Sequence, residues 1–172
     1  HTISFGIQER WDVLSWVEFA RERFGKETQI FLYGVSMGAA TVMMAAGCDL
    51  PENGMGVLAD CGYSSAPEII KKVILDMQLP RNAAYPFVRA AGRLFGGFDI
   101  EETSPMEAVQ KARVPIVFIH GDTDDFVPYD MSVELHKVCV SQKKMVTIKD
   151  AGHGLAFPVD RKGYVEALRE FE

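Results

Sequence analysis

Residues 34–38 read Gly-Val-Ser-Met-Gly and directly follow the apolar run from Ile30 to Tyr33. A G-x-S-x-G pattern at the end of a buried strand predicts a sharp turn into a helix, which leaves the central hydroxyl projecting and exposed. We expect both flanking glycines to be required, because a Cβ at either position would crowd this turn. Ser36 is then a nucleophile, although a pattern this short is also compatible with an ordinary turn serine.

The composition is that of an ordinary globular domain. The chain has 172 residues, 48% of them hydrophobic and 24% charged, which suits one domain with a substantial core. Its formal net charge of −6 argues against a nucleic-acid partner, because nucleic acids attract a basic face. No stretch approaches the roughly 18 apolar residues of a transmembrane helix, so we expect no membrane segment.

The cysteines indicate neither a disulfide framework nor a metal site. Cys48, Cys61 and Cys139 are odd in number and far apart, and no C-x-x-C pattern or Cys/His cluster accompanies them. We therefore expect free thiols in a reducing, cytoplasmic environment, with no metal and no cofactor.

Short apolar runs alternate with helical periodicity along the chain. We expect buried strands at 30–33, 55–59, 114–119 and 145–148. Helices are expected at 8–24, 37–46, from 104 onward, 131–140 and 160–171. This alternation predicts an α/β fold with a parallel sheet and right-handed crossovers.

The first two expected helices differ in character. The helix at 37–46 is apolar nearly all round, which predicts an internal position. The helix at 8–24 is amphipathic, and we expect Trp11 and Trp16 to serve its packing rather than to bind a ligand.

Residues 64–98 are apolar but irregular, because Pro80, Pro86 and a pair of glycines interrupt them. This segment is either a lid over the site or a packed excursion that covers the core. Its apolar character would suit an acyl or aromatic substrate, and we favour the lid.

Three candidate catalytic side chains follow strands of the expected sheet. Ligands bind beyond the carboxyl ends of parallel strands, so chemistry is expected at these positions. Ser36 follows the first strand, the stretch 120–128 (His-Gly-Asp-Thr-Asp-Asp-Phe-Val-Pro) follows the third, and 150–154 (Asp-Ala-Gly-His-Gly) follows the fourth. The chain order serine, aspartate, histidine is the one associated with a serine turn on this kind of sheet.

On the motifs at 34–38, 120–128 and 151–154 the chain resembles the α/β-hydrolase superfamily, in particular its bacterial esterase-like and serine-aminopeptidase-like branches. The resemblance covers nearly the whole chain and implies an α/β-hydrolase fold, with a helical lid at 64–98. The sheet of the family is larger, and only its last four strands are visible here. We therefore expect a single domain of which this chain is the C-terminal part, with the N-terminal strands missing.

The resemblance also implies which residue is the acid. It selects Asp124, because the Val-Pro pair at 127–128 follows this residue at the expected distance. Asp122 and Asp125 are close rivals by sequence alone. Asp60, after the second strand, lies where some members of the family carry their acid instead.

The roles follow from what acyl transfer requires. A serine hydroxyl is a poor nucleophile at neutral pH, so His153 would accept the proton of Ser36 as attack begins. The acid would orient the imidazole and stabilise the imidazolium that forms. The backbone N–H of Met37 would supply half of an oxyanion hole, and the second donor is expected outside this chain. His120 is expected to be structural, with its ring hydrogen-bonded, and His136 to be solvated.

Without further strands, the strand that begins at Ile30 would be an exposed edge of the sheet. Its unpaired N–H and C=O groups favour association. We expect this edge to pair with another chain or with the missing N-terminal segment.

The sequence therefore predicts a serine hydrolase that cleaves a small-molecule ester, or a thioester or small amide, through an acyl-enzyme on Ser36. Two alternatives stay open at this point. The same three residues serve acyltransferases and serine peptidases, and the incomplete oxyanion hole is compatible with a non-catalytic binding protein that keeps the fold.

Overall fold

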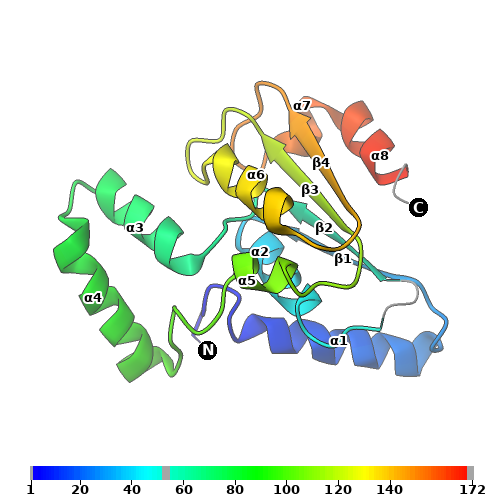
Figure 1. The fold of residues 1–172 in the computed structure, drawn as a ribbon, viewed down its shortest axis with the longest axis horizontal. Coiled ribbons are helices and arrows are strands. Elements are labelled where there is room, and N and C mark those ends of the chain that lie inside the picture. Colours follow the sequence, from blue (N-terminus) through cyan, green and yellow to red (C-terminus); the bar gives the residue numbers. More distant parts are fainter. Residues whose placement is uncertain (1, 52–54, 170–172) are drawn as a thin grey trace.

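The core of the fold is one parallel sheet (Figure 1). A computed structural model describes residues 2–51 and 55–169. The four strands lie in the order β1 (Ile30–Val35), β2 (Met55–Asp60), β3 (Ile116–Gly121) and β4 (Lys143–Ile148). Every neighbouring pair is parallel. The predicted α/β class and parallel sheet are confirmed, and the strand boundaries shift by no more than two residues.

Helices connect the strands and extend the chain on either side of the sheet. Their bounds are α1 (Glu9–Phe24), α2 (Met37–Ala46), α3 (Ala66–Asp76), α4 (Arg81–Ala91), the π-helical turn η1 (Gly92–Gly96), α5 (Pro105–Val109), α6 (Tyr129–Val138), α7 (Ala156–Val159) and α8 (Arg161–Arg169).

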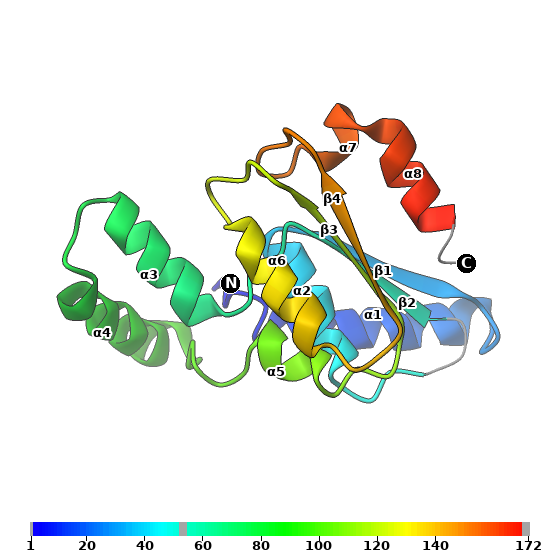
Figure 2. The same cartoon turned by 45° about the horizontal axis from the view of Figure 1, so that its top comes forward.

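Helices cover the two faces of the sheet unequally. Figure 2 shows α2 and α6 on one face of the sheet and α8 on the opposite face. In the larger part of the core, α2 packs against the strands, and Leu135 of α6 belongs to the same cluster of buried side chains. The smaller side joins β2 and β3 to Tyr164 of α8. Burial on both faces explains why β3 is apolar along most of its length, since all of its residues are buried.

The internal position predicted for the second helix is confirmed. Every residue from Ala39 to Ala46 in α2 is buried. Because no polar face has to reach solvent, the helix can be apolar all round.

The packing predicted for the tryptophans of α1 is wrong. Trp16 is 69% exposed and Trp11 is 53% exposed. Within α1, Val17 and Arg10 are the buried residues, and Val13 packs beside Val17. The helix thus contacts the core through a narrow stripe, and the two indoles lie outside it.

The last two predicted helices are also displaced. The helix expected at 131–140 is α6, which begins two residues earlier, at Tyr129. The helix expected at 160–171 is α8, which begins at Arg161, and the last two expected residues lie outside the described part. A separate short helix, α7, precedes it and was not predicted. Asp160 lies between α7 and α8, and its Oδ1 accepts a hydrogen bond from the N–H of Gly163 at 2.9 Å. An aspartate in this position caps a new helix start, so α8 begins at Arg161.

The segment 64–98 forms a helical projection. Figure 1 shows α3 and α4 side by side, extending away from the sheet. One face of α3 is anchored, because Ile69, Ile70 and Ile74 pack into a buried cluster with Tyr63. No residue of α4 is buried, so this helix lies over α3 without entering the core.

The described sheet ends at β1. Among the described residues, no strand pairs with the outer side of β1, and Phe31 and Tyr33 are 57% and 56% exposed. Within residues 2–51 and 55–169, no helix is long and apolar enough to cross a membrane.

Candidate active site

The turn after β1 holds Ser36 in an unusual backbone conformation. Ser36 has a φ of 55° and a ψ of −117°, a backbone conformation that residues other than glycine rarely adopt. The Ser36 N–H donates to the carbonyl of Asp60 at 2.8 Å, so the ladder between β1 and β2 continues up to the turn. The serine is therefore fixed at the junction between β1 and α2.

Only one of the two flanking glycines is required by space. A Cβ on Gly34 would lie 2.2 Å from the backbone of Gly38, which is impossible without moving the turn. A Cβ on Gly38 would meet nothing within 4 Å. The predicted steric requirement therefore holds at Gly34 and is wrong at Gly38, because the Cβ position of Gly38 points into open space.

The structure brings Ser36, His153 and Asp124 into one line of hydrogen bonds. The Oγ of Ser36 lies 2.9 Å from Nε2 of His153. The Nδ1 of His153 lies 2.8 Å from Oδ2 of Asp124. The Asp124 side chain is fully buried, whereas that of His153 is 25% exposed and open to a reactant.

Several donors converge on the carboxylate of Asp124. Its Oδ1 accepts the N–H groups of Phe126 and Val127 at 3.0 and 2.9 Å. Its Oδ2, which faces His153, also lies 3.1 Å from Nε2 of His120. The loop after β3 therefore holds the carboxylate rigidly in front of the His153 ring.

The rival carboxylates do not reach His153. Asp122 and Asp125 are exposed, and Oδ1 of Asp122 instead accepts the N–H of Asp150 at 2.7 Å. Asp60 is buried, and its Oδ2 accepts the hydroxyl of Tyr164 at 3.0 Å. Burial raises the pKa of Asp60, and its Oδ1 is buried without a partner among the described residues.

His120 has the structural surroundings expected for it. Its side chain is completely buried, with Nδ1 2.6 Å from Oγ of Ser132 and Nε2 3.0 Å from the carbonyl of Val127. Burial lowers the pKa of His120, so the neutral ring is favoured. The contacts fit a ring that donates from Nε2 and accepts the Ser132 hydroxyl at Nδ1.

The solvated position predicted for His136 is wrong. Its ring is half-buried and meets the ring of Phe118 edge to face, with centroids 5.8 Å apart. Burial lowers the pKa of His136. A helical position alone does not tell which side of α6 faces the sheet.

Cys61 is a neighbour of the site that the sequence did not identify. It follows β2 at a φ of 46°, and a ligand atom of Cys61, Asp124 and His153 each lies within 4.8 Å of the others. Burial raises the pKa of the Cys61 thiol to about 12, so this thiol stays protonated. Asp124 and His153 are hydrogen-bonded to each other, and the second ring nitrogen of His153 faces Ser36, so these two side chains are already engaged in the line of hydrogen bonds.

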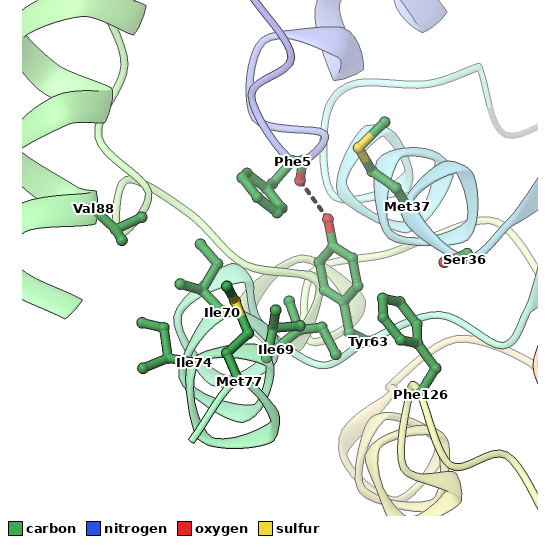
Figure 3. A pocket seen from close by; sticks show the side chains of 11 residues that line it. Phe5, Ser36, Met37, Tyr63, Ile69, Ile70, Ile74, Met77, Val88 and Phe126 are labelled. Carbon is green, nitrogen blue, oxygen red and sulfur yellow. Dashed lines mark hydrogen bonds between the residues drawn. The ribbon is translucent and has the colours of Figure 1, made fainter. Parts of the chain in front are cut away.

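An apolar cavity of about 430 Å³ lies beside Ser36 (Figure 3). One wall is α3, and Phe5, Tyr63 and Phe126 enter from other parts of the chain. Sequence reasoning anticipated the α3 side chains as a lid but missed these three aromatic residues. Tyr63 and Phe126 follow β2 and β3, but the sequence does not tell which side chains of such loops face the cavity.

The parallel sheet and the serine turn define an α/β-hydrolase fold. A family model described as the prolyl oligopeptidase family matches residues 5–171, and the chain belongs to this family. The chain is 25% identical over 171 residues to uncharacterized protein YqkD of Bacillus subtilis, covering 99% of this chain and 56% of that protein. It is 26% identical over 163 residues to uncharacterized protein YfhR of Escherichia coli K12, covering 93% and 51%. It thus spans about half the length of these relatives.

Solved structures with the same fold include both esterases and peptidases. The esterase Pf2001 of Pyrococcus furiosus aligns with a TM-score of 0.71 at 20% identity, over 99% of this chain and 63% of that chain. A puromycin-hydrolyzing peptidase of Mycobacterium tuberculosis aligns with a TM-score of 0.70 at 19% identity, over 95% and 25%. An acylaminoacyl peptidase of Pyrococcus horikoshii aligns with a TM-score of 0.60 at 18% identity, over 96% and 26%. At these identities the likeness establishes the shared fold.

Proposed function

We propose that the protein is a serine hydrolase that cleaves carboxylic esters through an acyl-enzyme on Ser36. The observation that carries this proposal is the line of hydrogen bonds from Ser36 through His153 to Asp124, at 2.9 and 2.8 Å. A nucleophile, a base and a group that orients the base are the parts that acyl transfer requires.

In the proposed reaction, His153 takes the proton of Ser36 at Nε2 while Oγ attacks the ester carbonyl. Asp124 keeps the proton of His153 on Nδ1 and stabilises the imidazolium. Met37 is the first residue of α2, so its N–H has no partner within the helix and can donate to the oxyanion. The alcohol leaves with the proton of His153, and water then repeats the sequence on the acyl-enzyme.

An ester is favoured over a peptide by the cavity beside Ser36. Its lining is almost entirely hydrocarbon, and it offers few free polar groups to the N–H and C=O groups of an extended peptide. Peptide cleavage remains the second candidate, because the family is named for prolyl oligopeptidase and peptidases share the fold.

Labelling with a fluorophosphonate probe tests the nucleophile. The protein should be labelled, Ser36→Ala should not, and Ser15→Ala should be labelled as the unaltered protein is, since Ser15 lies exposed on α1. Absence of serine-dependent labelling would end the hydrolase proposal. Rates on an ester and on an amide with the same acyl group then separate esterase from peptidase, and faster amide cleavage would reverse the assignment.

A further inference from the structure

The projecting helices form one side of the cavity beside Ser36. Ile70, Ile74 and Met77 line it from the α3 side, and Val88 contributes from α4 (Figure 3). Its volume of about 430 Å³ is within the range of small-molecule sites. The α3–α4 projection therefore shapes a binding site that reaches Ser36.

The lining is uncharged. Among the described residues that line the cavity there is no aspartate, glutamate, lysine, arginine or histidine. The hydroxyl of Tyr63 is occupied, because it donates to the carbonyl of Phe5 at 2.9 Å. The cations of α3 are paired, Lys71 with Glu68 and Lys72 with Asp76, and the Lys72 ammonium lies 5.7 Å from the centroid of the Phe126 ring without lining the cavity. A charged or strongly polar group would lose its hydration here without gaining a partner.

The position of His153 distinguishes the two halves of an ester. The leaving alcohol has to receive its proton from Nε2 of His153, so it must lie on the His153 side of Ser36. The cavity is lined by Ser36 and by Met37, the proposed oxyanion donor, but not by His153. The part of the substrate that enters the cavity is therefore the part that stays on the serine.

We infer that the α3–α4 cavity is an acyl pocket for a neutral, apolar acyl group such as a medium-length fatty acyl chain. This inference rests on the proposed function, because it names the acyl half of the ester that Ser36 attacks. Each methylene that the pocket removes from water strengthens binding, so the rate should rise with acyl length until the pocket is full.

Two ester series test the assignment on the full-length protein. In p-nitrophenyl esters from acetate to decanoate, kcat/KM should rise about tenfold or more towards octanoate. In acetate esters of alcohols from ethanol to octanol, it should change little. A rise in the alcohol series with a flat acyl series would overturn the assignment, because the pocket would then hold the leaving group.

A matched pair of variants connects the preference to the cavity. Met77, the residue that caps the C-terminus of α3, lines it and is 65% exposed, whereas Leu75, 49% exposed in the last turn of α3, does not line it. Met77→Asp should lower the octanoate-to-acetate ratio about tenfold, because a carboxylate enters the apolar wall. Leu75→Asp should leave the ratio unchanged. Equal ratios in the two variants would contradict the acyl pocket.

Ser36→Ala separates this inference from the proposed function. The variant keeps the walls of the cavity, so calorimetry should detect octanoate binding that Met77→Asp weakens, with acetate as the control. Serine-dependent labelling with no acyl preference and no octanoate binding would overturn the pocket and leave the hydrolase. Octanoate binding without labelling would overturn the hydrolase proposal and retain an apolar site.

Discussion

At the residue scale, the site depends on how one carboxylate is held. Asp124 has donors from Phe126, Val127, His120 and His153, whereas Asp60 contacts Tyr164. Both carboxyls are buried near Ser36, but only the side chain of Asp124 is hydrogen-bonded to His153. The roles of the two aspartates can therefore be distinguished by substituting each in turn.

Asp124→Asn should lower kcat for ester cleavage by about 10⁴-fold, because an amide at this position favours the wrong imidazole tautomer. Asp60→Asn should change kcat by less than about tenfold, since Asp60 does not orient His153. Steady-state kinetics of the two variants, with folding checked by circular dichroism, measure the difference. A larger loss in Asp60→Asn would mean that the acid follows β2.

The buried ring of His120 should make stability depend on pH. Its pKa in the folded protein is lowered from 6.5, so the unfolded chain takes up this proton first as the pH falls. The stabilisation is complete above about pH 6.5 and is lost as the pH falls from there through the pKa of the folded protein. Asp60 acts in the opposite direction, because a raised carboxyl pKa costs stability as the pH rises.

Urea unfolding at about pH 8 and about pH 5.5 measures this dependence. The free energy of unfolding should be lower at the acidic pH, and His120→Asn should show a smaller difference between the two conditions. Asp60 is present in both proteins, so the comparison isolates the histidine. Identical pH dependence of the two proteins would show that His120 is not the titrating group.

The three proposed catalytic residues could be located from the sequence because each follows a predicted strand. Parallel strands end at one edge of the sheet, so the order of the motifs places Ser36, Asp124 and His153 together. Cys61 and Phe126 also follow strands, but neither belongs to a catalytic pattern in the sequence. Their proximity to the site depends on local backbone turns and on packing between distant segments, which have no periodic pattern in the sequence.

At the element scale, the connection between β1 and α2 is tightly constrained at one of its two glycines. Gly34 lies against the backbone of the helix that follows it, whereas Gly38 faces open space. The two glycines look equivalent in the motif, and only the structure shows that they are not.

Gly34→Ala should destabilise the fold by about 1–3 kcal/mol, because its Cβ would overlap the backbone of α2. Gly38→Ala should be neutral or stabilising by up to about 1 kcal/mol, since alanine favours a helix. Chemical denaturation of both variants checks the pair. Equal destabilisation would argue that Gly38 is also confined.

The buried elements were more predictable than the peripheral ones. A helix such as α2 is apolar on all sides, so its buried position can be predicted without knowing which of its faces packs against the sheet. In α1 the aromatic residues and the valines form two competing apolar stripes on the helix surface. The valine stripe packs against the core, and the aromatic stripe is exposed. The start of α8 depends on a single cap at Asp160, which hydrophobic periodicity does not record.

At the scale of the whole molecule, β1 is an edge strand of the described sheet, and two of its aromatic side chains are exposed. Phe31 and Tyr33 of β1 border a second apolar depression, with Phe157 and Tyr164 on its other side. An exposed edge strand with apolar side chains promotes self-association.

Phe31→Lys should reduce self-association of the 172-residue chain, because a lysine on an edge strand opposes pairing. Phe24→Lys is the matched control, since Phe24 is 69% exposed at the end of α1 and outside the sheet. Light scattering against concentration compares both variants with the unaltered chain. An equal effect of the two lysines would indicate a charge effect that is unrelated to the edge.

The separation of the candidate catalytic residues along the chain has a practical consequence. Ser36 and His153 are 117 residues apart, and the whole sheet has to assemble before their side chains meet. An unfolded chain therefore contains only ordinary, unreactive serines. If Ser36 reacts as proposed, the extent of fluorophosphonate labelling titrates the folded molecules in a sample, and the same reagent becomes a quantitative folding assay.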